Sequence, residues 1–211
     1  MGVSKVNTRS NWSTNNPVLL PGEVGVEATT NNVKIGNGVS PWNKLPYFAN
    51  AGYWGSFWDV TSQTAVADTP TAIKLRSTDT DSRGVRIDNE SRMTFENAGV
   101  YSITFSIQFS NSDTQIHDVN VWLRKNDSGS TGDVPASDSR FSIISSHGGI
   151  DGNVIGCVNF VLKLQANDYI ELMWVTSNAA AYIHAEPAQT SPFTHPAIPG
   201  IICTAVPVAS A

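Results

Sequence analysis

One short stretch near the middle of the chain restricts its fold more than any other feature. In residues 100–110, VYSITFSIQFS, apolar and polar side chains alternate without interruption from Tyr101 onward. A period of two places neighbouring side chains on opposite faces of a β-strand, whereas a helix would distribute them around its axis. We therefore predict a strand with one face in a core, and this face consists of Tyr101, Ile103, Phe105, Ile107 and Phe109.

Several later segments repeat the strand pattern and are separated by polar turns. They are HDVNVWLRKND (117–127), CVNFVLKLQAND (157–168), YIELMWVTS (169–177), AYIHAE (181–186) and GIICTAVPV (200–208). No helical pattern longer than two turns is convincing. Short strands with turns at regular spacing are typical of an all-β sandwich or jelly roll.

The segment 169–177 is apolar on both faces. Ile170, Leu172 and Trp174 form one face, while Tyr169, Met173 and Val175 form the other. Only one face of a strand meets the core of a two-sheet sandwich, so a monomer would leave the second face in water. We therefore expect Tyr169, Met173 and Val175 in a subunit interface, with Glu171 at its edge or paired across subunits.

Residues 187–211 contain five prolines and no Asp, Glu, Lys or Arg. Prolines exclude a helix and a membrane span. Two interpretations stay open: a loop followed by a buried final strand, or a segment that lines a subunit interface, because charge depletion marks both kinds of core.

The charge composition argues against several partners. The chain has 13 Lys and Arg against 18 Asp and Glu, a formal net charge of −5, without the basic patch of a nucleic-acid binder. No segment reaches the ~18 uninterrupted apolar residues of a membrane span, and residues 1–13 lack the apolar core of a signal peptide. Cys157 and Cys203 lie in apolar runs, and we expect both to be buried, reduced thiols.

Candidate catalytic and metal sites are weak. Asp79, Asp81, Gly84 and Glu90 fall at positions of a calcium loop, but Arg83 stands where an oxygen ligand is required. The four histidines are dispersed, and no nucleophile elbow or phosphate-binding glycine loop occurs. We expect neither an enzyme nor a metal or other cofactor.

The N-terminal region contains a compact pattern of its own. Two strand-like runs, residues 23–28 and 32–36, flank the polar turn TTNN, which predicts a β-hairpin. Gly36 and Gly38 would provide positive φ angles. Trp42 and Leu45 would then pack on the apolar side of the hairpin, made of Val24, Val26 and Ile35. So small a hairpin needs neighbouring copies or a larger particle for stability.

Residues 16–48 resemble a short module of bacteriophage tail-fibre and other virion appendage proteins. The residues that carry the resemblance are Asn16, Pro17, Leu19, Gly22, Glu23, Lys34, Ile35, Gly36, Gly38, Trp42, Leu45, Pro46 and Tyr47, with Asn37 in place of the usual Asp. It implies that residues 1–50 attach the protein to a virion, with Gly36, Gly38, Trp42, Leu45 and Tyr47 as marks of the attachment module. We place the boundary near Ala51–Gly52 and the next strand at residues 56–60.

Residues 53–211 resemble the jelly roll of the tumour necrosis factor family, including the globular heads of complement-type proteins. The marks are MTFENAGVYSITFSIQF, with Gly99 and Tyr101 in place, VNVWLRKN, and LKLQANDYIEL, where Asn167 replaces a glycine. The resemblance implies ten strands, a homotrimer and a binding role.

Together these features predict a structural protein of a bacteriophage virion, assembled in the host cytoplasm. The leading hypothesis is a short trimeric tail fibre or spike, whose head contacts a glycan or protein of the host surface during adsorption. The alternative is a capsid decoration protein or head fibre, because no repetitive shaft separates the two parts. A polysaccharide-degrading tailspike is a third hypothesis, disfavoured because no catalytic site is visible.

Overall fold

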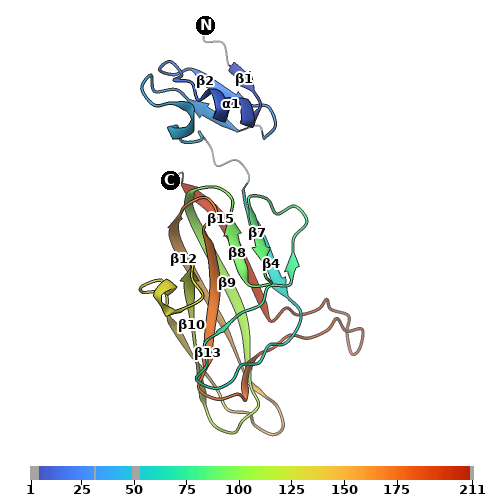
Figure 1. Ribbon diagram of the computed structural model, residues 1–211. Coiled ribbons are helices and arrows are strands. Elements are labelled where there is room, and N and C mark those ends of the chain that lie inside the picture. The colour runs from blue at the N-terminus through green and yellow to red at the C-terminus, as the bar shows by residue number, and fades with distance from the viewer. Residues whose placement is uncertain (1–4, 31, 49–52, 210–211) are drawn as a thin grey trace.

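The computed structural model describes residues 5–30, 32–48 and 53–209. It contains a small N-terminal module and a larger β-sandwich head (Figure 1). The head strands are β4 (Gly55–Asp59), β5 (Thr71–Ala72), β6 (Ser77–Thr78), β7 (Val85–Asp88), β8 (Arg92–Phe95), β9 (Gly99–Asn111), β10 (His117–Lys125), β11 (Ser139–Ile143), β12 (Gly152–Leu164), β13 (Tyr169–Thr176), β14 (Ala181–Ile183) and β15 (Ile201–Ala209). The predicted first strand of the head is confirmed to within one residue by β4.

Two antiparallel sheets build the head. The β10 sheet has the order β11-β10-β13-β8-β7, and β5 pairs with β13 beside this path. The β9 sheet has the order β12-β9-β15-β4-β6, and β14 pairs with β9. The all-β jelly-roll prediction is confirmed. The ten expected strands correspond to the two five-strand paths, and β5 and β14 are additional short strands.

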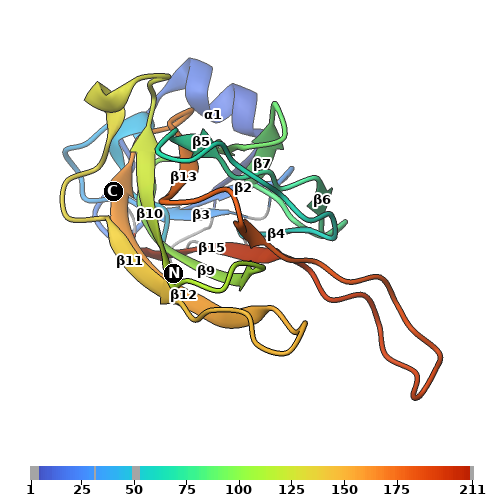
Figure 2. The same ribbon diagram turned by 90° about the horizontal axis from the view of Figure 1, so that it is seen from below.

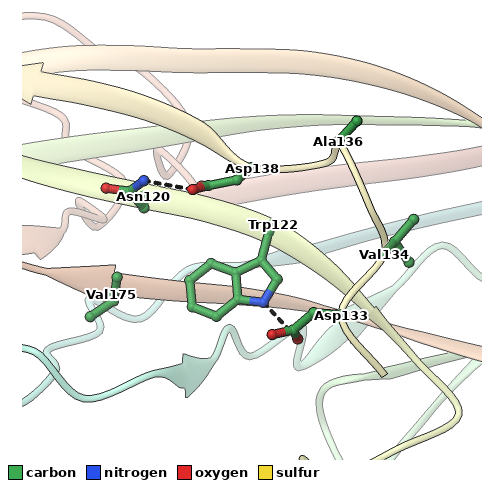
Figure 3. Close-up of a pocket in the computed structure, with 7 residues that line it drawn as sticks. All are labelled: Asn120, Trp122, Asp133, Val134, Ala136, Asp138 and Val175. Carbon is green, nitrogen blue, oxygen red and sulfur yellow. Dashed lines mark hydrogen bonds between the residues drawn. The ribbon is translucent and has the colours of Figure 1, made fainter. Parts of the chain in front are cut away.

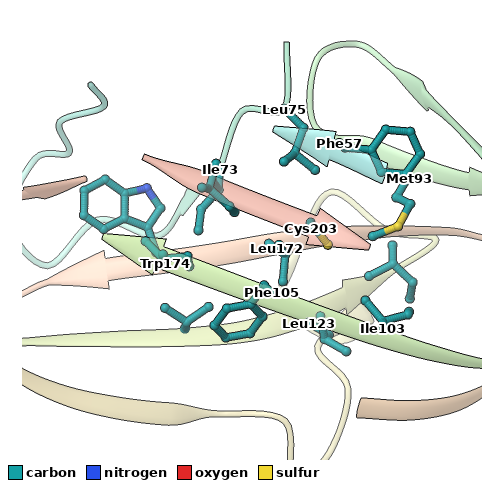
Figure 4. Packing of buried hydrophobic residues seen from close by; sticks show 14 of the residues in the cluster. Phe57, Ile73, Leu75, Met93, Ile103, Phe105, Leu123, Leu172, Trp174 and Cys203 are labelled. Carbon is teal, nitrogen blue, oxygen red and sulfur yellow. The ribbon is translucent and has the colours of Figure 1, made fainter. Parts of the chain in front are cut away.

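The core lies between the two sheets. The predicted apolar face of β9 is buried throughout, and Phe105 and Phe109 are fully inaccessible to solvent. Phe57, Leu172, Trp174 and Cys203 from other strands belong to the same core, together with Ile73 from the segment just after β5 (Figure 4). The ring centroids of Phe109 and Trp174 lie 6.4 Å apart, so the sheets interlock through aromatic contacts.

The expectation that a monomer leaves Met173 in water is wrong. Its side chain is only 4% exposed in the single chain, and Tyr169 and Val175 are half-buried. Trp122 and Ala72, its register partners on the neighbouring strands, flank Met173 within the same sheet. The second apolar face of β13 is therefore largely covered inside one subunit.

The uncharged C-terminal region has the first of its two predicted structures, a loop followed by a final strand of the fold, and its role in a subunit interface stays a prediction. Residues 201–209 form β15, a central strand that pairs with β9 and β4. Before it, residues 186–198 form a ribbon held by backbone bridges between Glu186 and Ile198 and between Gln189 and His195. Figure 2 shows this ribbon extending away from the sandwich.

The N-terminal module has more secondary structure than the predicted hairpin. β2 (Val24–Glu27) and β3 (Val33–Ile35) are antiparallel as expected, but β1 (Lys5–Asn7) adds a parallel third strand. Helix α1 (Arg9–Asn15) and the 3₁₀ turn η1 (Trp42–Lys44) cover this sheet. Thr8 caps α1, because its hydroxyl accepts a hydrogen bond from the Asn11 backbone N–H at 3.3 Å.

The core of the module differs from the predicted one. Trp42 and Leu45 are buried with Trp12 and Leu19, and the indole rings of Trp12 and Trp42 stack at 4.2 Å. They cover the Gly25 face of β2, because the strand period turns Val24 and Val26 to the other side.

Glycines permit this packing in two ways. A Cβ at Gly25 would lie 2.5 Å from the Trp42 ring. Gly38 has the predicted positive φ of 74°. Gly36 does not, and its role is a close approach instead, because a Cβ there would lie 2.3 Å from the Leu20 carbonyl oxygen.

Candidate functional site

A hollow of about 350 Å³ opens on the outer face of the β10 sheet. Its lining residues come from β10, from the loop between β10 and β11, and from β13: Asn120, Trp122, Asp133, Val134, Ala136, Asp138 and Val175 (Figure 3). We call this the Trp122 pocket. Its size lies at the lower end of the range for small-molecule sites.

Hydrogen bonds hold the side chains of the Trp122 pocket in place. The indole N–H of Trp122 donates to Asp133 Oδ1 at 2.8 Å, and Arg124 Nε donates to the same oxygen at 2.7 Å. The hydrogen bond from the Arg124 guanidinium holds the pKa of Asp133 below its usual range. Burial acts in the opposite direction, and the hydrogen bond from the Trp122 indole lowers the pKa further. Asp133 therefore stays ionised and fixes the tryptophan ring.

A second pair lies across the pocket. Asn120 Nδ2 donates to Asp138 Oδ2 at 2.8 Å. Within the described part of the chain, Asn120 Oδ1 and Asp138 Oδ1 accept no hydrogen bond, and no cation pairs with Asp138. The pocket thus combines a half-buried aromatic ring with unused acceptor oxygens.

The loop between β10 and β11 is shaped by its polar sequence. Ser137 accepts a hydrogen bond from the Leu123 N–H at 3.0 Å and donates to the Val134 carbonyl at 2.8 Å. Ala136 beside it has a φ of 61°, an unusual angle for a residue with a side chain. This folding brings Asp133 and Asp138 over the β10 strand.

A second notable surface is the outer face of β9, β12 and β15, which we call the β9 face. Its exposed apolar side chains include Val161, 59% exposed, Ile202, 42%, and Val206, 43%. Small polar residues separate these apolar side chains. For example, Ser102 of β9 is the register partner of Val161 on β12 and of Val206 on β15. Lys163 is the only charged residue that these three described strands place on this face.

The β9 face also holds one of the two cysteines. Cys203 is buried as expected, and burial raises the pKa of its thiol to about 12. Cys157 is exposed, so its predicted burial is wrong within a single chain. The sequence run around Cys157 is largely apolar because β12 carries Ile155 and Val161 on its outer face in addition to its inward apolar residues, so the run does not distinguish the outer face from the core.

The predicted interface residues lie on the opposite sheet from the β9 face. Tyr169, Met173 and Val175 belong to the outer face of β13 in the β10 sheet. Glu171 between them is paired within its own subunit. It accepts a 2.6 Å hydrogen bond from Ser91 Oγ and lies 3.7 Å from Arg92 Nε. An interface role for these three residues stays a prediction, but its premise of an exposed face has not held.

Two residues of the predicted attachment module, Trp42 and Tyr47, lie around Lys34. The Lys34 Nζ donates to the Trp42 carbonyl at 2.9 Å and lies over the Trp42 and Tyr47 rings at 4.9 and 4.4 Å. Burial lowers the pKa of Lys34, and Glu27 opposes this effect. Tyr47 donates to Glu27 at 2.7 Å. Lys34, absent from the predicted core, is thus its central polar residue.

The calcium-like motif is spread over two places. Asp79 and Asp81 lie in one turn, where Asp79 accepts the Asp81 N–H at 2.9 Å. Glu90 instead faces Arg76 and Lys74, at 3.7 and 3.9 Å. In residues 5–30, 32–48 and 53–209, no three His, Cys, Asp or Glu side chains gather in a way that would hold a metal ion. Nor does any helix there have the length and apolarity to cross a membrane.

The comparisons with known proteins concern the two parts separately. Residues 5–40 match the family model of the major tropism determinant N-terminal domain. No curated protein matches the chain at a significant level. Among solved structures, the tumour necrosis factor Eiger of S. frugiperda has a TM-score of 0.51 at 14% identity, covering 75% of this chain and 94% of its own. The globular domain of zebrafish complement 1qA protein has a TM-score of 0.47 at 11% identity, with 75% and 99% covered.

The family match and the likeness to Eiger fit the geometry described above. The chain joins an N-terminal module whose residues 5–40 match the tropism-determinant model to a head whose jelly-roll fold is similar to that of Eiger. At this level of identity the second likeness concerns the fold alone.

The sequence prediction missed the Trp122 pocket. Asn120 and Trp122 occupy the outward positions of an alternating strand whose inward positions are Val119, Val121 and Leu123. A large aromatic residue in an outward position, followed by a long polar loop, was the available signal. Nothing in the sequence indicated that two of the aspartates of that loop, Asp133 and Asp138, would lie beside the ring.

Proposed function

We propose that this protein is a receptor-binding protein of a bacteriophage virion: the N-terminal module attaches to the particle and the head contacts the host surface. The observation that carries the proposal is the match of residues 5–40 to a tropism-determinant domain, joined to a head with a separate core. A binding rather than catalytic role belongs to the proposal.

The orientation of the head agrees with this proposal. The C-terminal part of β15 pairs with the beginning of β9, so Ala209 and Val100 share one pole, and the module lies beside that pole in Figure 1. The opposite pole consists of turns that bind one another, with Ser112 N–H donating to the Ala180 carbonyl at 3.1 Å and Ser146 N–H to the Asp113 carbonyl at 2.7 Å. A head attached through the module would present this far pole outward.

We further propose that three copies assemble through the β9 face. Its valine and isoleucine side chains are exposed in a single chain among small uncharged polar residues, and Lys163 is the only charged residue on its three described strands, which suits the centre of an interface. The outer face of the β10 sheet is less suitable, because Arg92, Arg124 and Glu171 lie on it, all with partners inside the subunit. The proposed interface thus replaces the one predicted around Met173.

A full-length variant tests the attachment role. Gly25→Val would push a side chain into the stacked Trp12 and Trp42 rings, which should disrupt the module and leave the head folded. We expect purified wild-type protein and the variant to compete equally with intact particles for host cells. The variant should be lost from assembled particles.

Three results would count against the proposal. Wild-type protein that does not reduce particle adsorption at saturating concentration would contradict receptor binding. Particles that lack the protein, adsorb normally and have a less stable shell would favour the capsid decoration alternative. Incorporation of the Gly25→Val variant at the wild-type level would contradict attachment through the module.

A further inference from the structure

We propose that the Trp122 pocket binds a neutral sugar unit of a host-surface polysaccharide. This inference rests on the proposed receptor-binding function and adds a location and a ligand class to it. Three properties of the pocket carry it: a fixed aromatic ring, unused acceptor oxygens beside that ring, and a surplus of negative charge.

The Trp122 ring is prepared to act as a stacking platform. Its indole N–H is already bonded to Asp133 at 2.8 Å, and Met173 lies opposite it on β13. Val134, Ala136 and Val175 add apolar surface around it (Figure 3). A pyranose has an apolar C–H face, which gains most from a flat ring that loses little conformational freedom on binding.

The polar groups of the pocket match the hydroxyl groups of a sugar. Asn120 Oδ1 and Asp138 Oδ1 are acceptors without donors among the described residues. Hydroxyl groups on adjacent sugar carbons supply such donors, and hydrogen bonds to a carboxylate are stronger than those between neutral groups. The Asn120–Asp138 hydrogen bond keeps both side chains in position before the ligand arrives.

The charges around the pocket argue against an acidic ligand. Arg124 is bonded to Asp133, and Arg140 at the rim lies 3.7 Å from Asp118. Asp138 has no such cation within the described chain, so one carboxylate charge is left over. An acidic sugar or a phosphate would be repelled and would find no free guanidinium. A cationic ligand such as choline is the main competing class, because it would favour both the ring and the carboxylate.

The pocket and the proposed interface lie on different sheets. Trp122 belongs to the outer face of the β10 sheet, whereas the β9 face belongs to the other sheet. Assembly through the β9 face therefore leaves three pockets open on one particle appendage. Several weak sugar sites in one assembly bind a repetitive polysaccharide far more tightly than one site alone.

The test uses the full-length protein and an NMR titration of its tryptophan N–H signals. The probes are methyl glycosides of glucose, galactose, mannose, rhamnose and N-acetylglucosamine, together with N-acetylneuraminic acid and choline. We expect at least one neutral glycoside to shift the Trp122 signal saturably, with a dissociation constant of roughly millimolar size. Acidic sugar and choline should leave this signal unchanged.

Variants locate the binding. Trp122→Ala and Asp138→Asn should each weaken glycoside binding about tenfold or more, while Trp122→Phe, which keeps a ring, should retain part of it. Asp81→Asn is the matched control, since Asp81 is an exposed carboxylate in a turn outside the pocket lining. Circular dichroism checks that each variant is folded, and Trp122→Phe and Asp138→Asn keep the test valid if Trp122→Ala does not fold.

Every outcome decides the inference. It is overturned if none of the neutral glycosides binds, if binding survives Trp122→Ala in the folded protein, or if choline or the acidic sugar binds instead. Adsorption assays separate this failure from failure of the proposed function. If the wild-type protein and Trp122→Ala block particle adsorption equally, the receptor site lies elsewhere. If sugar binds in the pocket but the protein does not block adsorption, the receptor-binding proposal fails and the pocket assignment stands.

Discussion

Substituting Val206 by Asp should separate the proposed trimer without unfolding its subunits. Val206 is 43% exposed in the single chain and lies in register with Ser102 and Val161 across the β9 face. Met173→Arg would be a poor test of assembly, because Met173 is only 4% exposed and an arginine there would disturb each subunit by itself.

The size of the effect follows from burial. Moving a valine side chain from water to a core contributes ~1.5–3 kcal/mol, and the 43% of Val206 that is still exposed accounts for ~0.6–1.3 kcal/mol per subunit. Three copies give ~2–4 kcal/mol. An aspartate adds a desolvation cost of several kcal/mol for each buried, unpaired charge. Because a dissociated subunit keeps this carboxylate in water, its own fold should change little.

Light scattering after size-exclusion chromatography measures the outcome. We expect three subunits per particle for the wild type and one for Val206→Asp, with similar circular dichroism spectra. Val66→Asp is the control, because Val66 is 70% exposed in a loop away from the β9 face. A monomeric wild type, or a Val206→Asp variant that keeps the wild-type mass, would refute assembly through this face.

Two further predictions concern cysteine reactivity and acid stability. Cys157 lies on the β9 face, so a thiol reagent should modify it in Val206→Asp but not in assembled wild type; equal labelling of both would contradict the interface. Asp168 accepts hydrogen bonds from Lys125 Nζ, Asn126 Nδ2 and Gln165 N–H at 2.7, 2.6 and 2.7 Å. Burial by itself would raise the pKa of Asp168, but these hydrogen bonds outweigh burial, so the pKa of Asp168 is lowered. A lowered pKa in the folded state means that stability is present above the unfolded value of about 3.9 and is lost as the pH falls below it. Asp168→Asn should therefore lose ~1.5–3 kcal/mol at pH 7 and show a smaller fall in melting temperature on acidification; an unchanged acid transition would contradict this role.

The strand pattern of the head was predictable because alternation encodes the two faces of a strand. In residues 100–110 the alternation predicted which side chains face the core, and every apolar side chain of the predicted face of β9 is buried. The resemblance to tumour necrosis factors further gave the number of strands on the main paths of both sheets.

Burial of an outward face was not predictable in the same way. Met173 is covered because Trp122 and Ala72, from two distant segments, flank it in the sheet. Alternation gives the side of a strand on which a residue lies, but it gives no information about the size of the neighbours across the sheet. The same limit applies to Gly25, whose missing Cβ decides which face of β2 the Trp42 ring covers.

The Trp122 pocket could not be predicted from the sequence for a related reason. Asp133 and Asp138 reach Trp122 and Asn120 only through the path of the loop from residue 126 to residue 138. Loop paths depend on single backbone angles such as the positive φ of Ala136, and polar composition alone does not specify them.

The placement of the module and of Ala209 at one pole has a practical consequence for protein engineering. The turn at His147–Ile150 lies between β11 and β12 at the other pole and includes Gly148 and Gly149, around which no atoms crowd. A foreign peptide inserted there would interrupt no strand and would point away from the attached end. The head could thus carry a guest epitope on the outside of a particle, in three copies if the proposed assembly holds.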